Sequence, residues 1–267
     1  MRRSSVSSGW ALAAYAALTG CGNQPPPAAA NAPGTRQYQP ATLAEAVVLR
    51  NGTAIENFLA LGVDPNEPEE DGTTPLMRAV HGQMPTTARL LIEAGADVKK
   101  ANSYGVTALY IAAQAGDAVA TQVLLSAGAD ANAALPASGE TVLMTAAKTG
   151  NAEVVHALLT GGFDGVSIDQ LGEARAAARV AEAAGYSQQT NPALATNYAD
   201  VNVRERLYGR TALMIASLEG HMDVVRMLVE AGSDLNVVDA EGSTALSLAR
   251  SSNNLDVAAF LEGAGSR

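Results

Sequence analysis

The chain has 267 residues, of which 48% are hydrophobic, 16% are charged and only 4% are aromatic. The apolar fraction is sufficient for a buried core, and the scarcity of aromatic residues favours small, closely packed helices over a β-sandwich or barrel. The formal net charge of −10 argues against nucleic acid as a partner, because nucleic-acid-binding domains are usually basic. With a single cysteine, the chain can form neither an internal disulfide nor a zinc site built from several cysteines.

The first twenty residues (1–20) are predicted to be a signal peptide. Arg2 and Arg3 precede an apolar run over residues 10–18, which is too short to anchor the chain by crossing a bilayer. The run ends in Leu18-Thr19-Gly20-Cys21, a sequence that resembles the cleavage site of bacterial lipoproteins. The resemblance implies cleavage before Cys21 and acylation of this residue, so that the membrane is contacted only through an N-terminal lipid anchor. The alternative is an ordinary signal peptide in which the only cysteine falls here by chance.

Residues 21–40 contain almost no large apolar side chains and include a run of three prolines, so we expect a disordered tether. Gly22 follows the cysteine, whereas in enterobacterial lipoproteins an Asp at this place retains the protein in the inner membrane. The resemblance therefore implies a lipid-anchored protein of the bacterial cell envelope that faces the periplasm, with the outer membrane favoured.

A pattern with a period of about 33 residues begins after residue 40. A glycine, a variable residue, a threonine, another variable residue and a leucine recur five times, and the starting glycines are 33, 34, 70 and 33 residues apart. An alanine stands three residues after each leucine, a second leucine stands twelve residues after the alanine, and a glycine stands four residues further on. The five starting segments are Gly72–Leu76, Gly105–Leu109, Gly139–Leu143, Gly209–Leu213 and Gly242–Leu246.

Each unit of this pattern predicts two short helices. The threonine can cap the first helix through its hydroxyl group, with Pro75 suited to a first helical position. A residue in the left-handed conformation is expected to end the first helix, namely Gly116, Gly150, Gly220 and, in the last unit, Asn253. In the second unit Gly82 stands one residue early, so that turn is expected to differ.

These registered positions resemble the ankyrin repeat, whose consensus reads Gly-x-Thr-Pro-Leu-His-x-Ala, then Val-Val and Leu-Leu, then Gly-Ala-Asp-x-Asn. The resemblance implies that residues 41–267 form an all-α solenoid of about six helix-turn-helix repeats with short β-hairpin connections. The consensus histidine is replaced by other residues, so we expect its local hydrogen bond to be absent and apolar packing to substitute for it. The replacing residues are Met77, Tyr110, Met144, Met214 and Ser247. The repeats are expected at about residues 41–68, 69–101, 102–135, 136–205, 206–238 and 239–267.

Residues 163–198 interrupt the register of the fourth repeat. The stretch Ile168–Ala184 is rich in alanine with interleaved Glu and Arg, and it is followed by Gly185, which predicts a helical insertion. A decayed repeat is the alternative, because the interval of 70 residues is nearly two periods. The insertion is favoured, because no helix with paired leucines follows Gly185.

The sequence offers no recognisable catalytic, cofactor-binding or metal site, and we expect no cofactor and no enzyme activity. The three histidines, His81, His156 and His221, do not have metal-ligand spacing, and neither a nucleophile elbow nor a phosphate-binding loop is present. An enzyme would have to use the insertion at 163–198, which contains acidic residues but no His, Cys or Lys.

An interaction surface is the remaining functional feature. In ankyrin proteins the concave face is formed by hairpin residues near the starting glycine and by the end of the first helix. The resemblance implies a protein partner of unknown identity for a solenoid that is monomeric by itself; an anchored inhibitor of a toxic enzyme is the alternative. Tyr104, Leu207, Tyr208 and Leu218 are expected to be exposed, although the tyrosines could instead pack between hairpins. The implied partner-binding residues are Glu70, Asp71, His81, Tyr104, Gln114, Lys148, Tyr208, Arg210 and Leu218.

Overall fold

The computed structural model describes residues 40–162 and 198–265. Residues 40–267 form one compact unit, separate from residues 1–39. The predicted signal peptide, Cys21, the tether and nearly all of the predicted insertion therefore lie outside the described residues. Among the residues that are described, no helix is long and apolar enough to cross a membrane.

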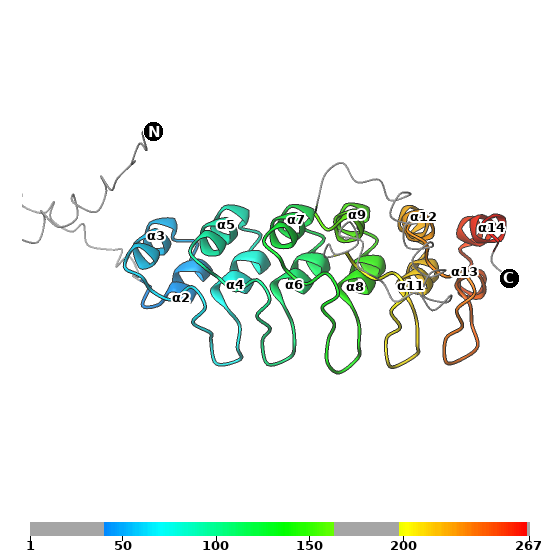
Figure 1. Ribbon diagram of the computed structural model, residues 1–267, viewed down its shortest axis with the longest axis horizontal. Coiled ribbons are helices and arrows are strands. Elements are labelled where there is room, and N and C mark those ends of the chain that lie inside the picture. Colours follow the sequence, from blue (N-terminus) through cyan, green and yellow to red (C-terminus); the bar gives the residue numbers. More distant parts are fainter. Residues whose placement is uncertain (1–39, 163–197, 266–267) are drawn as a thin grey trace, which may run out of the picture. The chain divides into compact units, whose positions relative to one another are not determined.

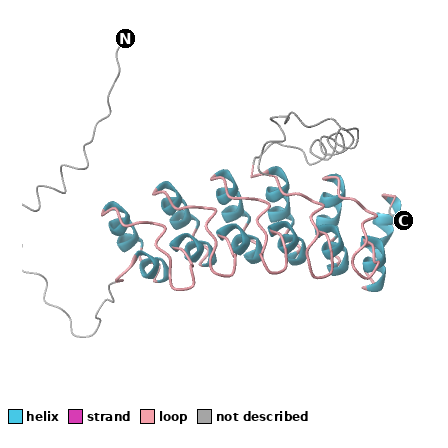
Figure 2. Ribbon diagram, turned by 60° about the horizontal axis from the view of Figure 1, so that its bottom comes forward, coloured by secondary structure: helices cyan, strands magenta, loops and turns pink. Residues whose placement is uncertain are grey.

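Six helix-turn-helix pairs stand side by side in the described part of residues 40–267 (Figures 1 and 2). The first helices form one layer, the second helices form the layer above it in Figure 1, and the connecting loops project below. The all-α solenoid is confirmed; the connections are hairpin-like loops that contain only two isolated β-bridges in the described ranges, Ala101 with Thr107 and Ala134 with Thr141. The pairs are α2 (Leu43–Val48) with α3 (Gly52–Ala60), α4 (Pro75–His81) with α5 (Pro85–Glu93), α6 (Ala108–Ala115) with α7 (Ala118–Ser126), α8 (Val142–Thr149) with α9 (Ala152–Thr160), α11 (Ala212–Glu219) with α12 (Met222–Glu230), and α13 (Ala245–Ser251) with α14 (Leu255–Gly263).

The threonine of each starting segment caps the first helix of its repeat, as predicted. Its hydroxyl oxygen accepts a hydrogen bond from the backbone amide three residues later, which satisfies one of the amides that have no partner within the helix. Pro75 occupies the first position of α4, where its missing amide hydrogen costs nothing. The capping residues are Thr74, Thr107, Thr141, Thr211 and Thr244.

The expectation that the local hydrogen bond of the consensus histidine is absent is wrong in three repeats. The backbone amide of Thr244 donates to Oγ of Ser247 at 2.8 Å. The amides of Thr74 and Thr141 donate to the sulfur atoms of Met77 and Met144, both at 3.5 Å. A hydroxyl or thioether at the third helical position can reach back to the amide of the capping residue, so three of these helices have reciprocal capping without histidine.

The first helices end in left-handed residues, as predicted. Gly116, Gly150 and Gly220 have φ angles of 68°, 72° and 80°, and Asn253 has a φ of 61°. In the second repeat Gln83 takes this conformation with a φ of 52°. Gly82 has a φ of −75° there, because it stands one residue before the position that requires the left-handed turn.

The core lies between the two helix layers and runs through all six repeats. The leucine and alanine of each starting segment and the leucine of each second helix are all buried. Because they recur in every repeat, neighbouring repeats bury one another's apolar faces. These core residues are Leu76, Ala79, Leu91, Leu109, Ala112, Leu124, Leu143, Ala146, Leu158, Leu213, Ala216, Leu228, Leu246, Ala249 and Leu261.

The fourth and fifth repeats pack directly against each other. Helix α8 contacts α11, and α9 contacts α12. The amide of Ala199 donates to the carbonyl oxygen of Leu158 at 3.0 Å, as the amide of Ala129 donates to Leu124 at 2.9 Å in the third repeat. Ala199 thus occupies the place in the fourth repeat that Ala129 occupies in the third, and the insertion of the intervening residues stays a prediction. Of the predicted insertion 163–198, all residues but the last lie outside the described ranges.

Candidate functional site

Asparagine side chains fix the positions of the connecting loops relative to one another. Asn66 donates from Nδ2 to the carbonyl oxygen of Gly95 at 3.0 Å and accepts from the amide of Asp97 at 2.6 Å. Asn132 makes the same two bonds to Tyr198 and Asp200, at 2.9 and 2.7 Å. Each bridge joins one repeat to the next, so the loops form a continuous, positioned surface. We call the surface formed by these loops and the first helices the inner face.

A groove of about 270 Å³ lies on the inner face between the fourth and fifth repeats. The loops that precede α8 and α11 supply one wall, and the ends of these two helices supply the other. We call it the inner groove. Four of the predicted partner-binding residues lie here: Lys148, Tyr208, Arg210 and Leu218. The full lining is Ser138, Glu140, Lys148, Glu205, Leu207, Tyr208, Arg210, Ile215, Leu218 and Glu219.

Glu205 organises the loop that forms one wall of the inner groove. Its buried carboxylate accepts hydrogen bonds from the backbone amides of Leu207 at 2.6 Å, Tyr208 at 2.7 Å and Arg210 at 3.0 Å. Burial raises the pKa of Glu205, but the three amides and the charge of Arg210 together hold it below its ordinary value. Glu205 is therefore ionised at neutral pH, and its charge is compensated within the loop.

Arg210 connects the fifth repeat to the sixth. Its Nε donates to Oδ2 of Asp239 at 3.2 Å, a second nitrogen lies 3.9 Å from Oε2 of Glu241, and its guanidinium stacks 4.8 Å from the ring centre of Tyr208. The Asp239 side chain is fully buried, whereas that of Arg210 is 19% exposed. Arg210 thus has partners inside the chain, and its main contribution to the inner groove is to support the Tyr208 ring.

Two large apolar side chains stand exposed on the rim of the inner groove. Leu207 is 69% exposed and Tyr208 is 49% exposed, which confirms the predicted exposure of both. Leu218 was also predicted to be exposed, and that prediction is wrong, because its side chain is half-buried against the core at the end of α11. Exposed aromatic and aliphatic groups beside a half-buried floor are typical of protein-binding surfaces.

The other predicted residues lie on the second and third repeats, away from the inner groove. Tyr104 is 73% exposed on its loop, and Glu70, His81 and Gln114 are exposed as well. Asp71 is held in a turn, because its carboxylate accepts from the amide of Thr73 at 2.9 Å, and this bond lowers the pKa of Asp71. The predicted partner-binding residues therefore lie in two parts of the inner face, the inner groove and the second and third repeats.

The sequence reasoning missed Glu205 and Ile215 as groove residues. A signal for Glu205 exists, because an acidic or amide residue opens the loop in four repeats, namely Glu69, Asn102, Glu205 and Asp239. The amide of each of these residues donates to the carbonyl oxygen that closes the same loop. At Asn102, Glu205 and Asp239 the side chain also accepts backbone amides of that loop.

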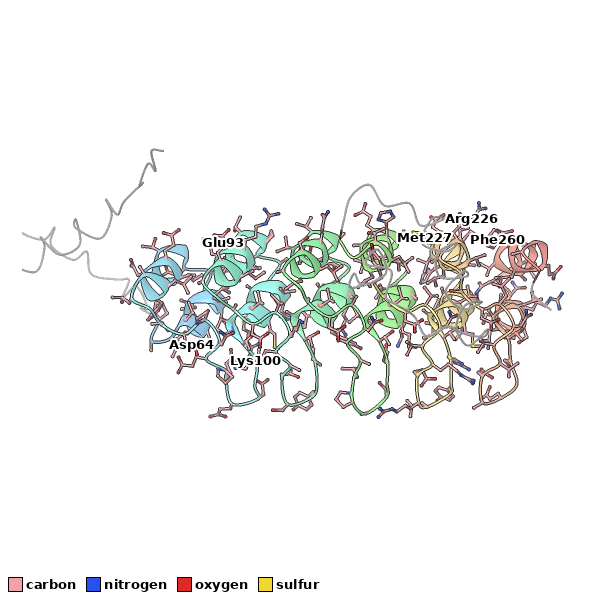
Figure 3. The ribbon with its side chains drawn as sticks, viewed as in Figure 1. Asp64, Glu93, Lys100, Arg226, Met227 and Phe260 are labelled. Carbon is pink, nitrogen blue, oxygen red and sulfur yellow. The ribbon has the colours of Figure 1, made fainter. Side chains whose placement is uncertain are left out.

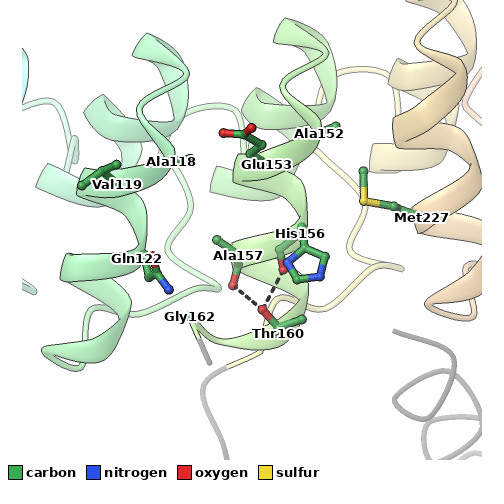
Figure 4. Close-up of a pocket in the computed structure, with 10 residues that line it drawn as sticks. All are labelled: Ala118, Val119, Gln122, Ala152, Glu153, His156, Ala157, Thr160, Gly162 and Met227. Carbon is green, nitrogen blue, oxygen red and sulfur yellow. Dashed lines mark hydrogen bonds between the residues drawn. The ribbon is translucent and has the colours of Figure 1, made fainter. Parts of the chain in front are cut away.

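A larger hollow of about 550 Å³ lies on the opposite side, among the second helices α7, α9 and α12 (Figure 4). Its lining includes Val119, His156, Thr160 and Met227, and the Thr160 hydroxyl donates to the carbonyl oxygen of His156 at 2.9 Å. Figure 3 places Met227 beside Arg226 and Phe260 in this second-helix layer.

Metal ligation has no visible basis in the described part of the chain. No group of three or more His, Cys, Asp or Glu residues there could hold a metal ion. His221 instead lies at the start of α12, where its Nε2 is 3.1 Å from the carbonyl oxygen of Lys148. This contact links the fifth repeat to the end of α8, next to the inner groove.

Comparison with known families agrees with this architecture. A family model described as ankyrin repeats in three copies matches residues 43–134, 100–169 and 175–265. The matched residues cover well over half of the chain, and ankyrin repeats form protein–protein interaction modules. The chain therefore belongs to the ankyrin repeat family.

Proposed function

We propose that this protein is a lipid-anchored, periplasm-facing module of the bacterial cell envelope that binds another protein on its inner face. The inner groove carries this proposal. It combines exposed apolar groups, Leu207 and Tyr208, with a loop that Glu205 and Arg210 already hold in place. Such a surface can bind with little loss of backbone freedom, because the loop is held in place before the partner arrives.

The proposed mechanism is recognition without a chemical step. Shape and charge complementarity across several repeats would select the partner, and the exposed tyrosines would supply buried contact area on binding. The lipid at Cys21 would confine this binding to the membrane surface, and residues 22–40 would give the repeats their reach.

Replacing Tyr104 and Tyr208 together by alanine should abolish co-purification of the native partner from detergent-solubilised membranes. Both rings are largely exposed, so the variant should melt nearly as the parent does, with a loss of about 1 kcal/mol from the Tyr208–Arg210 stack. Val119→Ala is the matched control, because Val119 is 53% exposed on a second helix and should keep the partner. A folded double variant that retains its partner would place the interface elsewhere.

Replacing Cys21 by serine should release the protein from the membrane fraction. Serine lacks the thiol to which the lipid is attached, and each buried CH₂ of an acyl chain contributes roughly 0.8 kcal/mol to membrane binding. The measurement is fractionation after a carbonate wash, followed by detection of the chain in pellet and supernatant. A variant that still sediments with the membranes would contradict the lipid anchor, while leaving the protein-binding role untouched.

A further inference from the structure

The size of the inner groove indicates what it can accept. Pockets for small molecules and cofactors have volumes of about 300–1,000 Å³, and the inner groove measures about 270 Å³. Its walls come from two neighbouring repeats. These dimensions suit one large side chain of a protein partner better than an independent small ligand.

The apolar part of the inner groove is arranged around a fixed loop. The amide of Arg206 donates to the carbonyl oxygen of Ser138 at 2.7 Å, and the amide of Ala240 donates to that of Tyr208 at 2.7 Å. These bonds tie the fifth loop to the fourth and the sixth. Leu207 and Tyr208 therefore line the inner groove together with the half-buried Leu218, and an inserted apolar side chain would displace water from all three.

Two charges beside this apolar patch, unlike Arg210, have no ion-pair partner in the described ranges. Lys148 is exposed near the end of α8, and Glu219 is exposed at the end of α11. Glu219 stands where the negative end of the helix dipole disfavours a carboxylate, and α11 has no basic residue in its last turn. A cation supplied by a partner would offset this local repulsion.

We propose that the inner groove receives one large apolar side chain of the partner, flanked by an acidic residue facing Lys148 and a basic residue facing Glu219. The partner segment therefore carries its large apolar residue between an acidic and a basic residue. This inference rests on the proposed function, because it names the chemistry of the partner for the same surface.

A library of linear 12-residue peptides displayed on phage, selected against the detergent-solubilised full chain, tests the proposal. The enriched peptides should share a large apolar residue between an acidic and a basic residue. Lys148→Glu should weaken their binding about tenfold, and a new selection on this variant should replace the acid by a base. Leu207→Asp should abolish binding without unfolding the chain, because Leu207 is 69% exposed.

Arg89→Glu is the matched control, because it reverses a charge in the same sense as Lys148→Glu at an exposed residue of the second helix α5, outside the inner face. It should change the affinity of the selected peptides less than twofold. Selection of no peptide, or of peptides that bind equally well to Lys148→Glu and Leu207→Asp, would overturn the inference. If the Tyr104 and Tyr208 double variant loses the native partner in that case, the proposed function stands; if it keeps the partner, both are wrong.

Discussion

Replacing Leu213 by alanine is expected to lower the free energy of unfolding by about 2–5 kcal/mol. The Leu213 side chain is fully buried in α11, a helix that packs against α8, α12 and α13. Removing its methyl groups leaves a cavity that helices fixed on several sides cannot fill by moving together. Leu143 has the same position in α8, so Leu143→Ala should have a similar effect.

Urea unfolding followed by circular dichroism measures this loss as a lower midpoint. Leu255→Ala is the matched control, because Leu255 is 63% exposed at the start of α14 and its truncation should change the free energy by less than about 0.5 kcal/mol. An unchanged midpoint for Leu213→Ala would mean that the repeat register is wrong in the fifth repeat.

The second large effect is expected at Asp239. Its replacement by alanine should lower the free energy of unfolding by about 2–3 kcal/mol. The Asp239 carboxylate accepts from the amides of Glu241 at 2.9 Å and Ser243 at 2.8 Å, and from Nε of Arg210 at 3.2 Å. Alanine would leave these three donors without an acceptor. Glu241→Ala should lower the free energy of unfolding by less than about 1 kcal/mol. The Glu241 side chain is 65% exposed, and its ion pair with Arg210 is long, at 3.9 Å.

The pH dependence of stability provides a second measurement on Asp239. Burial raises the pKa of its carboxyl, but the bonds from Ser243, Arg210 and Glu241 outweigh burial and lower the pKa below the ordinary value of 3.8. The stability that this carboxylate contributes is therefore complete above pH 3.8 and is lost as the pH falls through the lower, folded-state pKa. In Asp239→Asn the free energy of unfolding should fall less steeply as the pH is lowered. An unchanged acid transition would contradict the stabilising role of the ionised Asp239 carboxylate.

The sequence by itself determined the positions and ends of the helices and the residues of the core. Threonine capping at Thr107, a left-handed turn at Gly116 and burial of Leu124 each depend on the nearest turns of the chain or on a pattern repeated in every unit. Such local and periodic signals can be recognised without knowing which residues pack against the segment in the folded chain. Repetition also reduced the number of possible registers, because one register had to satisfy five units together.

Only the tertiary structure decided which residues of the inner face are available to a partner. The sequence predicts both Arg210 and Tyr104 as loop residues that bind a partner. In the structure Arg210 is paired with Asp239 of the next repeat, whereas Tyr104 is exposed. Leu218 is half-buried against the core, and this does not follow from the consensus. The physical reason is that loop side chains are satisfied across repeats, by donors and acceptors on loops that meet only when the solenoid has stacked.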